Sequence, residues 1–418
     1  MNKKILSMLA VAGVAITLAG CSATASSGSK QQTLNVWDMQ QSGKDINAAY
    51  APIIKSFEAA NPGITVKLTV FPYEQYQSKA LLAMKGGTGP DVLSLDQIWT
   101  AQFAAAKLVS PIDSQLAGSK DIKKADFFPG AWASNEYAGK TWGVPLNADV
   151  WEQMYYNADL FRAAGLDPDK PPTTWTEWNA DAAKLTDKAN DQYGMSLIGC
   201  KNEAAVVLSN SLLFSNGGSI ISGDKSKYDS AANIAGLKQY ATLASYAPPG
   251  VAAVCEQDAV SRFTAGKAAM LLDGSWQQDT MKTAAKFDWR IATPPSPAGK
   301  TFVGALGGFN LAVSAKSKDS ALAFKWIQAV SQPKNQIAVN SLIPALKAAG
   351  STFVKANRKQ PSVVLDTLEH GSARPLTPVY PLISQAQQDA VQAILGGEAP
   401  DKAAKDASTS ITSAINGN

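Results

Sequence analysis

The chain has 418 residues, of which 45% are hydrophobic and 17% are charged, a composition typical of a well-packed globular protein. This length exceeds what one hydrophobic core usually serves, so we expect two domains. The formal net charge of +4 is small, and no run of basic residues stands out. Charge therefore argues against nucleic acid or a bulk membrane surface as a partner.

The N-terminal residues have the layout of a secretory signal peptide. Lys3 and Lys4 precede an uncharged stretch over residues 5–20, which is shorter than the about 20 apolar residues that a membrane-spanning helix needs. We therefore predict a signal peptide over residues 1–20 rather than a helix of the mature fold. Residues 21–32 are rich in Ser and Gly and predict a flexible tether.

A cysteine stands at the predicted cleavage point. The sequence Leu-Ala-Gly-Cys at 18–21 resembles the bacterial lipobox, in which the cysteine is lipidated and becomes the first residue of the mature protein. The resemblance implies diacylglycerol on Cys21, and stable membrane anchoring takes two or more acyl chains. A free structural Cys21 is the alternative.

The segment after the tether predicts a βαβαβ unit. Residues 33–37 read as a strand, and 64–70 alternate apolar and polar side chains as a second strand does. The helix between them has apolar residues at helical spacing, and a second helix over 76–84 precedes a strand at 91–95. This order predicts a largely parallel sheet with right-handed crossovers.

Polar and aromatic residues stand where these strands end. Ligands of open α/β sheets bind beyond the carboxyl ends of the strands, near switches in strand order. Aromatic rings beside carboxylates and amides suit a small polar ligand with apolar faces, such as a sugar. The candidate ligand-binding residues from this geometry are Asp38, Gln41, Tyr73 and Asp96, with Trp37 and Trp99 beside them.

Helices and strands continue through the rest of the chain, with turn signals between them. The expected elements are a helix over 157–164, a helix capped by Thr174 with Glu177 in a capping box, strands over 268–272 and 309–313, and a helical tail over 383–415 broken at Gly396-Gly397 and Pro400.

Cysteine and histidine usage limits the chemistry. Beyond Cys21 the chain has Cys200 and Cys255, and an even pair in an oxidising compartment favours a disulfide over two buried thiols. The single histidine, His370, excludes a His-rich zinc site and reads as an exposed loop residue. We expect no metal and no cofactor.

Five segments, in order, carry a resemblance that covers essentially the whole mature chain. They are GVPLNADVWEQMYYNADLFRAAGLDPDKPPTTWTEW at 143–178 with Tyr193-Gly194, FTAGKAAMLLDGSW at 263–276, GGFNLAVSAKSKDSALAFKWI at 307–327, IPALKAA at 343–349 and LGGEAPDKAAKDA at 395–407. With these segments the chain resembles the family 1 extracellular solute-binding proteins, the maltose-binding-protein-like group.

The resemblance implies an α/β fold of two lobes, each a mixed, mostly parallel sheet flanked by helices, with the ligand in a cleft between them. The N-terminal lobe would comprise 33–145 plus 296–338, and the C-terminal lobe 146–295 plus 339–418. The chain would cross between lobes near 145–147, 294–301 and 328–342. Closure of such lobes is a hinge motion.

The resemblance also implies site residues. Trp276, in Gly274-Ser275-Trp276, matches a tryptophan that stacks on a sugar ring, although core packing would also explain it. Trp151 departs from the family's usual smaller polar residue and adds a stacking face or packs between lobes. The further matching positions are Asp149, Gly307, Gly308, Phe309 and Arg374.

The function implied is that of a lipid-anchored, extracytoplasmic, monomeric receptor that delivers a sugar to the permease of an ABC importer and catalyses nothing. A secreted glycosidase, which needs only two carboxylates, is the enzymatic alternative. A binding protein for a polyamine, metal ion or peptide is the other. Tyr155-Tyr156 suggests a ferric site, but in the family this doublet opens a helix, so we interpret it as structural. The sequence leaves the identity, chain length and linkage of the sugar open.

Overall fold

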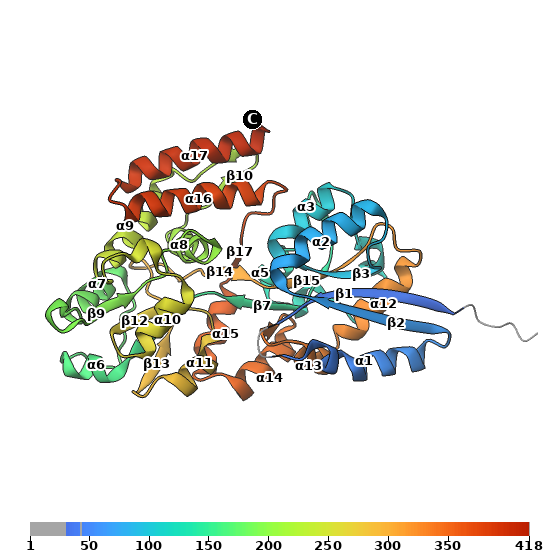
Figure 1. Cartoon of the computed structure of the whole chain (residues 1–418), viewed down its shortest axis with the longest axis horizontal. Coiled ribbons are helices and arrows are strands. Elements are labelled where there is room, and N and C mark those ends of the chain that lie inside the picture. Colours follow the sequence, from blue (N-terminus) through green and yellow to red (C-terminus); the bar gives the residue numbers. More distant parts are fainter. Residues whose placement is uncertain (1–30, 42–43, 418) are drawn as a thin grey trace, which may run out of the picture.

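The computed structural model describes residues 31–41 and 44–417. The predicted signal peptide, the lipidation residue Cys21 and the tether up to residue 30 lie outside the described residues. Two α/β bodies lie side by side, and a small sheet runs between them (Figure 1). None of the helices in the described part of the chain is long and apolar enough to span a membrane.

The first body contains a five-stranded sheet in the order β2-β1-β3-β15-β6. β1 pairs in parallel with β2 and β3, whereas β15 runs antiparallel to β3 and β6. Alternation along β1 sends Leu34 and Val36 into the core beneath α1, while Leu93 and Leu95 of β3 pack with α2 and α3. The strands are β1 (Gln32–Met39), β2 (Ile64–Phe71), β3 (Val92–Asp96), β6 (Val144–Pro145) and β15 (Phe309–Val313), and the helices are α1 (Ile46–Ala60), α2 (Tyr73–Gly86), α3 (Thr100–Ala105), α12 (Ser320–Val330) and α13 (Pro333–Val339).

The second body contains a four-stranded sheet in the order β13-β8-β12-β9. Its only parallel pair among the described residues is β12 with β9, so this sheet is mixed but less parallel than the sequence predicted. The strands are β8 (Gln153–Asn157), β9 (Tyr193–Ser196), β12 (Ala268–Asp273) and β13 (Trp289–Ala292), and the helices are α6 (Ala158–Ala163), α7 (Trp175–Lys184), α8 (Glu203–Ser215), α9 (Ala231–Ser245), α10 (Glu256–Thr264) and α11 (Gln277–Ala284).

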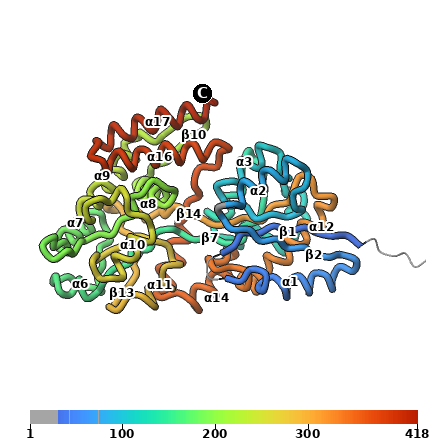
Figure 2. The backbone as a smooth tube through the Cα atoms, in the orientation of Figure 1, coloured from blue at the N-terminus to red at the C-terminus, as the bar shows by residue number. Residues whose placement is uncertain are grey.

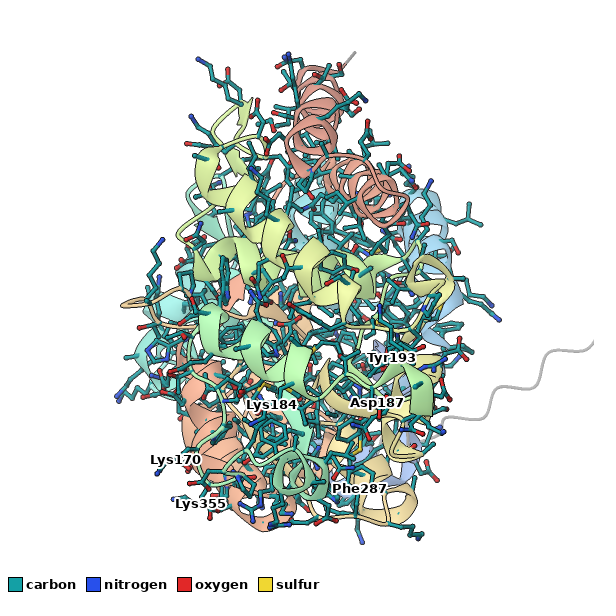
Figure 3. All side chains as sticks on the ribbon, turned by 90° about the vertical axis from the view of Figure 1, so that its left-hand side faces the viewer. Lys170, Lys184, Asp187, Tyr193, Phe287 and Lys355 are labelled. Carbon is teal, nitrogen blue, oxygen red and sulfur yellow. A yellow bond between two sulfur atoms is a disulfide. The ribbon has the colours of Figure 1, made fainter. Side chains whose placement is uncertain are left out.

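The C-terminal helices complete the second body. α16 (Tyr380–Leu395) and α17 (Pro400–Asn416) pack on α8 and α9 around a core of their own, which includes Leu213, Leu237 and Ile394. Figure 2 shows both helices lying across the top of this body. The outer end of the same body carries exposed charged side chains, among them Lys170, Lys184 and Asp187 (Figure 3).

A small sheet in the order β16-β7-β14-β17 lies between the bodies (Figure 1). β6 leads directly into β7, and β14 leads directly into β15, so the chain passes between the bodies through adjacent strands. Its elements are β7 (Asn147–Val150), β14 (Ala305–Gly307), β16 (Ile343–Pro344) and β17 (Ser372–Ala373), with α5 (Pro129–Ala133), α14 (Lys347–Asn357) and α15 (Pro361–Glu369) packed around it.

Residues 296–303 differ from the predicted arrangement, which placed them in the first lobe. The N–H of Trp175 donates to the Ser296 carbonyl, and the N–H of Val303 donates to Ser215 Oγ. Both contacts lie in the second body, so the connection back to the first body comes at β14 rather than at 294–301.

Short elements fill the connections. They are α4 (Asp113–Ala117), the hairpins β4 (Glu136–Tyr137) with β5 (Lys140–Thr141) and β10 (Ile221–Ser222) with β11 (Lys225–Ser226), and the 3-10 turns η1 (Gln97–Trp99), η2 (Lys124–Asp126), η3 (Lys188–Asn190) and η4 (Val251–Ala253).

Local sequence signals had different outcomes. The capping box at α7 is confirmed, because Thr174 accepts from the Glu177 N–H while Glu177 accepts from the Thr174 N–H. The prediction that Tyr155-Tyr156 opens a helix is wrong. Both residues lie in β8, where Tyr155 OH donates to the Gly274 carbonyl and Tyr156 OH donates to the Pro168 carbonyl. Strand pairing with β12 and β13 decides the conformation of this segment.

Candidate functional site

Asp96 ends β3, and its carboxylate is held in place from several sides. Oδ1 accepts from the Ile98 N–H at 3.1 Å and so caps η1, and Oδ2 accepts from Tyr73 OH at 2.8 Å. The side chain is buried, and burial raises the pKa of Asp96, while Arg374 and these two hydrogen bonds oppose the rise. The strand-end geometry thus brings Asp96 and Tyr73 together.

Aromatic rings surround this carboxylate on the first body. Tyr73 stacks on Trp99 with ring centroids 5.4 Å apart, and Phe309 lies 6.3 Å from Tyr73. Tyr73 is 40% exposed although it is a large aromatic residue. Part of this aromatic surface therefore faces solvent, where a ligand could reach it.

A second aromatic group belongs to the second body. Trp276 follows β12 by a short turn and is the N-cap residue of α11. Its ring meets Trp151 edge to face at 5.1 Å, and both rings are half-buried. Trp276 Nε1 donates to Glu256 Oε1 at 3.1 Å, and Gln277 Nε2 donates to the same oxygen at 2.8 Å. Glu256 therefore fixes the tryptophan's orientation.

Two glycines allow these groups to approach one another. A Cβ on Gly307 would lie 2.3 Å from Trp151 Nε1, and one on Gly308, where φ is +138°, would lie 2.3 Å from the Asn147 carbonyl. Phe309, next along the chain, then contacts Tyr73. A continuous line of neighbours therefore runs from Tyr73 through residues 307–309 to Trp151 and on to Trp276.

Arg374 joins the two bodies. It is 5% exposed, and its Nη1 lies 2.7 Å from Glu203 Oε1 at the start of α8, while Nη2 lies 3.6 Å from Asp96 Oδ1. Its Nε donates to the Leu306 carbonyl. Glu203 also accepts from Tyr380 OH and Ser384 Oγ of α16. The guanidinium thus connects a carboxylate of each body.

Asp149 is buried inside the structure rather than presented at its surface. It accepts from Ser275 Oγ at 2.6 Å, and the positive charge of Arg358 favours its ionised form. Burial raises the pKa of Asp149 to about 7, against the ordinary 3.8, while Ser275 and Arg358 oppose the rise. Because Ser275 directly precedes Trp276, this hydrogen bond holds the turn that carries the tryptophan.

Asp38 and Gln41 bond to other groups of the protein. Asp38 accepts from Ser94 Oγ at 2.6 Å and is 1% exposed. Gln41 donates to the Val339 carbonyl and accepts from the Ser341 N–H at 2.9 Å. These contacts fix the end of β1 and the segment before β16, which the strand-end argument could not show.

The sequence interpretation missed Glu203 and Glu256. Each begins a helix and holds a predicted site residue, Arg374 or Trp276. The signal that could have found them is their position after Cys200 and Cys255, which form a disulfide with Cα atoms 5.1 Å apart.

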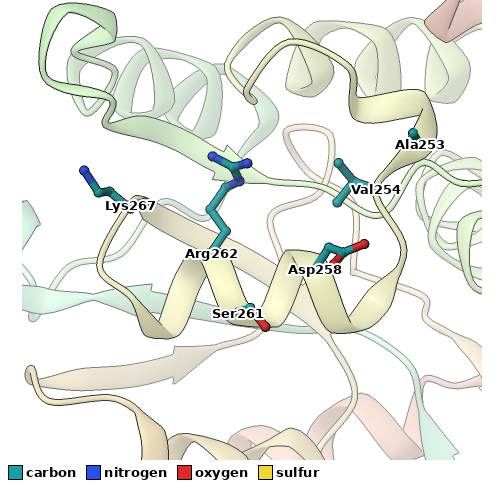
Figure 4. A pocket seen from close by; sticks show the side chains of 6 residues that line it. All are labelled: Ala253, Val254, Asp258, Ser261, Arg262 and Lys267. Carbon is teal, nitrogen blue, oxygen red and sulfur yellow. The ribbon is translucent and has the colours of Figure 1, made fainter.

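Other features of the second body lie outside these groups. A pocket of about 420 Å³ flanks α10 on the surface, lined by Ala253, Val254, Asp258, Ser261, Arg262 and Lys267 (Figure 4). In the described part of the chain, no three or more His, Cys, Asp or Glu side chains come together as a metal site would require.

Comparison with known proteins agrees with this architecture. The profile of the family described as bacterial extracellular solute-binding protein matches residues 41–337. A protein of Brucella abortus (strain 2308) named as a binding protein is 27% identical over 369 residues, covering 86% of this chain and 87% of that one.

Two solved structures share the fold. An ABC transporter solute-binding protein from Thermotoga lettingae, bound with α-D-tagatose, has a TM-score of 0.74 and 27% identity, covering 92% of this chain and all of that chain. The sugar-binding protein MalE from Xanthomonas citri has a TM-score of 0.79 and 24% identity, covering 92% of this chain and 98% of that one. The two-lobed α/β fold predicted from the sequence is thereby confirmed.

Proposed function

Because the chain belongs to the bacterial extracellular solute-binding protein family, which is not a family of enzymes, we propose that it binds a sugar or oligosaccharide between its two bodies and delivers it to the permease of an ABC importer. The observation that carries this proposal is the line of aromatic neighbours from Tyr73 to Trp276, which joins one body to the other. Sugars offer apolar CH faces to such rings and hydroxyls to the carboxylates beside them.

The charges in this region support a neutral ligand. Three carboxylates, those of Asp96, Glu203 and Glu256, accompany the Arg374 guanidinium. Arg374 is already paired with Asp96 and Glu203, so a phosphorylated ligand would have to displace these partners and would face carboxylates of like charge. Hydroxyl groups, in contrast, can donate to the carboxylates without displacing any charge.

Closure of the bodies around the ligand would use the strands of the central sheet. β6 to β7 and β14 to β15 both lead from one body toward the other, and hinges commonly lie at such element ends. Arg374 contacts carboxylates of both bodies, so its pairing would change as the bodies move. We expect a monomer to perform this cycle.

The proposed place of action is the extracytoplasmic face of the cell membrane, with diacylglycerol on Cys21 as anchor. The Leu-Ala-Gly-Cys sequence at 18–21 supports this. Cys21→Ser should move the protein from the membrane fraction to the soluble fraction, because the thiol that would carry the lipid is gone. A wild-type protein that is equally soluble and keeps a free Cys21 thiol would contradict the anchor.

A panel of ligands read by thermal shift tests the function. Maltose, maltotetraose and α-D-tagatose are the neutral probes, and glucose 6-phosphate is the matched anionic control. A sugar at 100 times its dissociation constant should stabilise the fold by about 2.7 kcal/mol. Stabilisation by the phosphate alone would contradict the proposal of a neutral ligand. Steady hydrolysis of maltotetraose would instead favour the glycosidase alternative.

A further inference from the structure

Two helices of the second body begin beside the same disulfide. Cys200 lies three residues before Glu203, the first residue of α8, and Cys255 directly precedes Glu256, the first residue of α10. The disulfide spans 55 positions of sequence. It therefore ties together covalently two helix starts that lie far apart in the sequence.

Glu203 and Glu256, the first residues of α8 and α10, bond to two predicted site residues. Glu203 accepts from Arg374, and Glu256 accepts from both Trp276 and Gln277. A carboxylate in the first turn is favoured by the partial positive charge of a helix N-terminus. The geometry of Arg374 and Trp276 is therefore set by where these first turns lie.

α10 has a special need for the cross-link. Its N-cap residue is Cys255 itself, and no side chain among the described residues makes a capping hydrogen bond there. The first turn of α8, by contrast, has Asn202 Oδ1 accepting from the Ala205 N–H at 3.3 Å. Backbone bonds add to the link, since the N–H groups of Gly199 and Cys200 both donate to the Val254 carbonyl.

We propose that the Cys200–Cys255 disulfide is a positioning element of the ligand site, which fixes Glu203 and Glu256 and through them Arg374 and Trp276. The role of these residues in a ligand site rests on the proposed function. Whether the disulfide positions them can be measured without any ligand. Opening the disulfide frees the uncapped start of α10, so Trp276 and the first turns lose their fixed arrangement before the fold is lost.

Hydrogen exchange under native conditions tests the proposal in the ligand-free Cys200→Ser/Cys255→Ser variant. Loss of a cross-link also lowers global stability, which the slowest amides of β8 and β12 report. We expect exchange in segments 200–206, 255–260 and 276–278 to accelerate by at least about tenfold more than in those strands. An acceleration no larger than that of β8 and β12 would overturn the proposal, because the disulfide would then stabilise the fold only in general.

Tryptophan fluorescence gives a second readout that a general loss of stability would not move. The same double substitution should shift the emission spectrum of the folded protein, because Trp276 loses its fixed bond to Glu256. In a Trp276→Phe background this shift should disappear. An equal shift in both backgrounds would contradict positioning through Glu256. If no sugar binds yet both readouts change as expected, only the proposed function fails.

Discussion

The two bodies hold their exposed aromatic surfaces by different means. On the first body Tyr73 bonds to Asp96, a carboxylate at the end of a β-strand. On the second body Trp276 bonds to Glu256, a carboxylate at the start of a helix whose preceding residue is cross-linked. A strand end is fixed by the whole sheet, whereas a single helix start needs a cap or a covalent tie. The difference shows that equivalent roles in one site can depend on unrelated structural supports.

Arg374 pairs with Asp96 of the first body and with Glu203 of the second. Its removal should therefore lower the unfolding free energy most. Arg374→Ala leaves Asp96 and Glu203 without their shared cation, and breaking a buried ion pair costs as much as about 5 kcal/mol. Urea unfolding should show this loss of unfolding free energy. Arg290→Ala is the control, because Arg290 also pairs with two carboxylates, Asp169 and Asp288, but at the surface, where such pairs contribute about 0–1 kcal/mol. Equal losses in both variants would contradict a central role for Arg374.

Asp149 accepts a hydrogen bond from Ser275, the residue before Trp276, and its buried carboxyl should make the unfolding free energy depend on pH. Burial raises its pKa to about 7 from 3.8, so the folded state binds the proton more tightly than the unfolded state. The stability contributed by the neutral acid is present below about pH 4 and is lost as the pH rises through about 7. Asp149→Asn removes this loss, which is less than about 4 kcal/mol. The unfolding free energy of the variant relative to wild type should therefore rise between about pH 4 and pH 8.

Urea unfolding across that pH range measures the effect. Asp121→Asn, at an exposed position, is the control and should follow the wild-type pH dependence. Asp149→Asn with a wild-type pH profile would show that the buried carboxylate is not held as a neutral acid in the folded protein.

The Tyr73–Asp96 bond should have the smallest effect. Tyr73→Phe keeps the ring that stacks on Trp99 and removes only the hydroxyl, while Asp96 retains the Ile98 N–H and Arg374. The loss in unfolding free energy should be about 1 kcal/mol, the usual net contribution of one hydrogen bond. A loss as large as that of Arg374→Ala would mean that Asp96 depends on Tyr73 rather than on the strand end.

Sequence periodicity predicted the first body well. Alternation over 64–70 and the helical spacing before it correspond to β2 and α1, and the strand-end argument placed Tyr73 beside Asp96. The capping box at Thr174 was equally readable. These features depend on residues close in sequence or on the general geometry of parallel strands, so a pattern could find them.

The features that the sequence did not predict depend on contacts between residues far apart in the chain. Glu256 at the start of α10 bonds to Trp276 at the start of α11, with β12 between them in the sequence. Arg374 bonds to Glu203, 171 positions away. Asp38 and Gln41 satisfied the strand-end argument, yet their contacts are with Ser94 and with residues 339–341. Residue type and position predict where a polar group lies. Whether it bonds to the protein or stays available to a ligand depends on the packing around it.

The central claim is that one sugar contacts both bodies. Calorimetric titration of Trp276→Ala and Tyr73→Ala, with whichever of maltose, maltotetraose or α-D-tagatose binds wild type most tightly, tests it directly. Each variant should weaken binding, by roughly 2 kcal/mol for Trp276 if it acts as a hot spot. Trp175→Ala is the control, because that half-buried indole bonds to the Pro295 carbonyl and belongs to α7, at the outer end of the second body (Figure 1). Wild-type affinity in both Trp276→Ala and Tyr73→Ala would contradict the account and make the two residues packing groups.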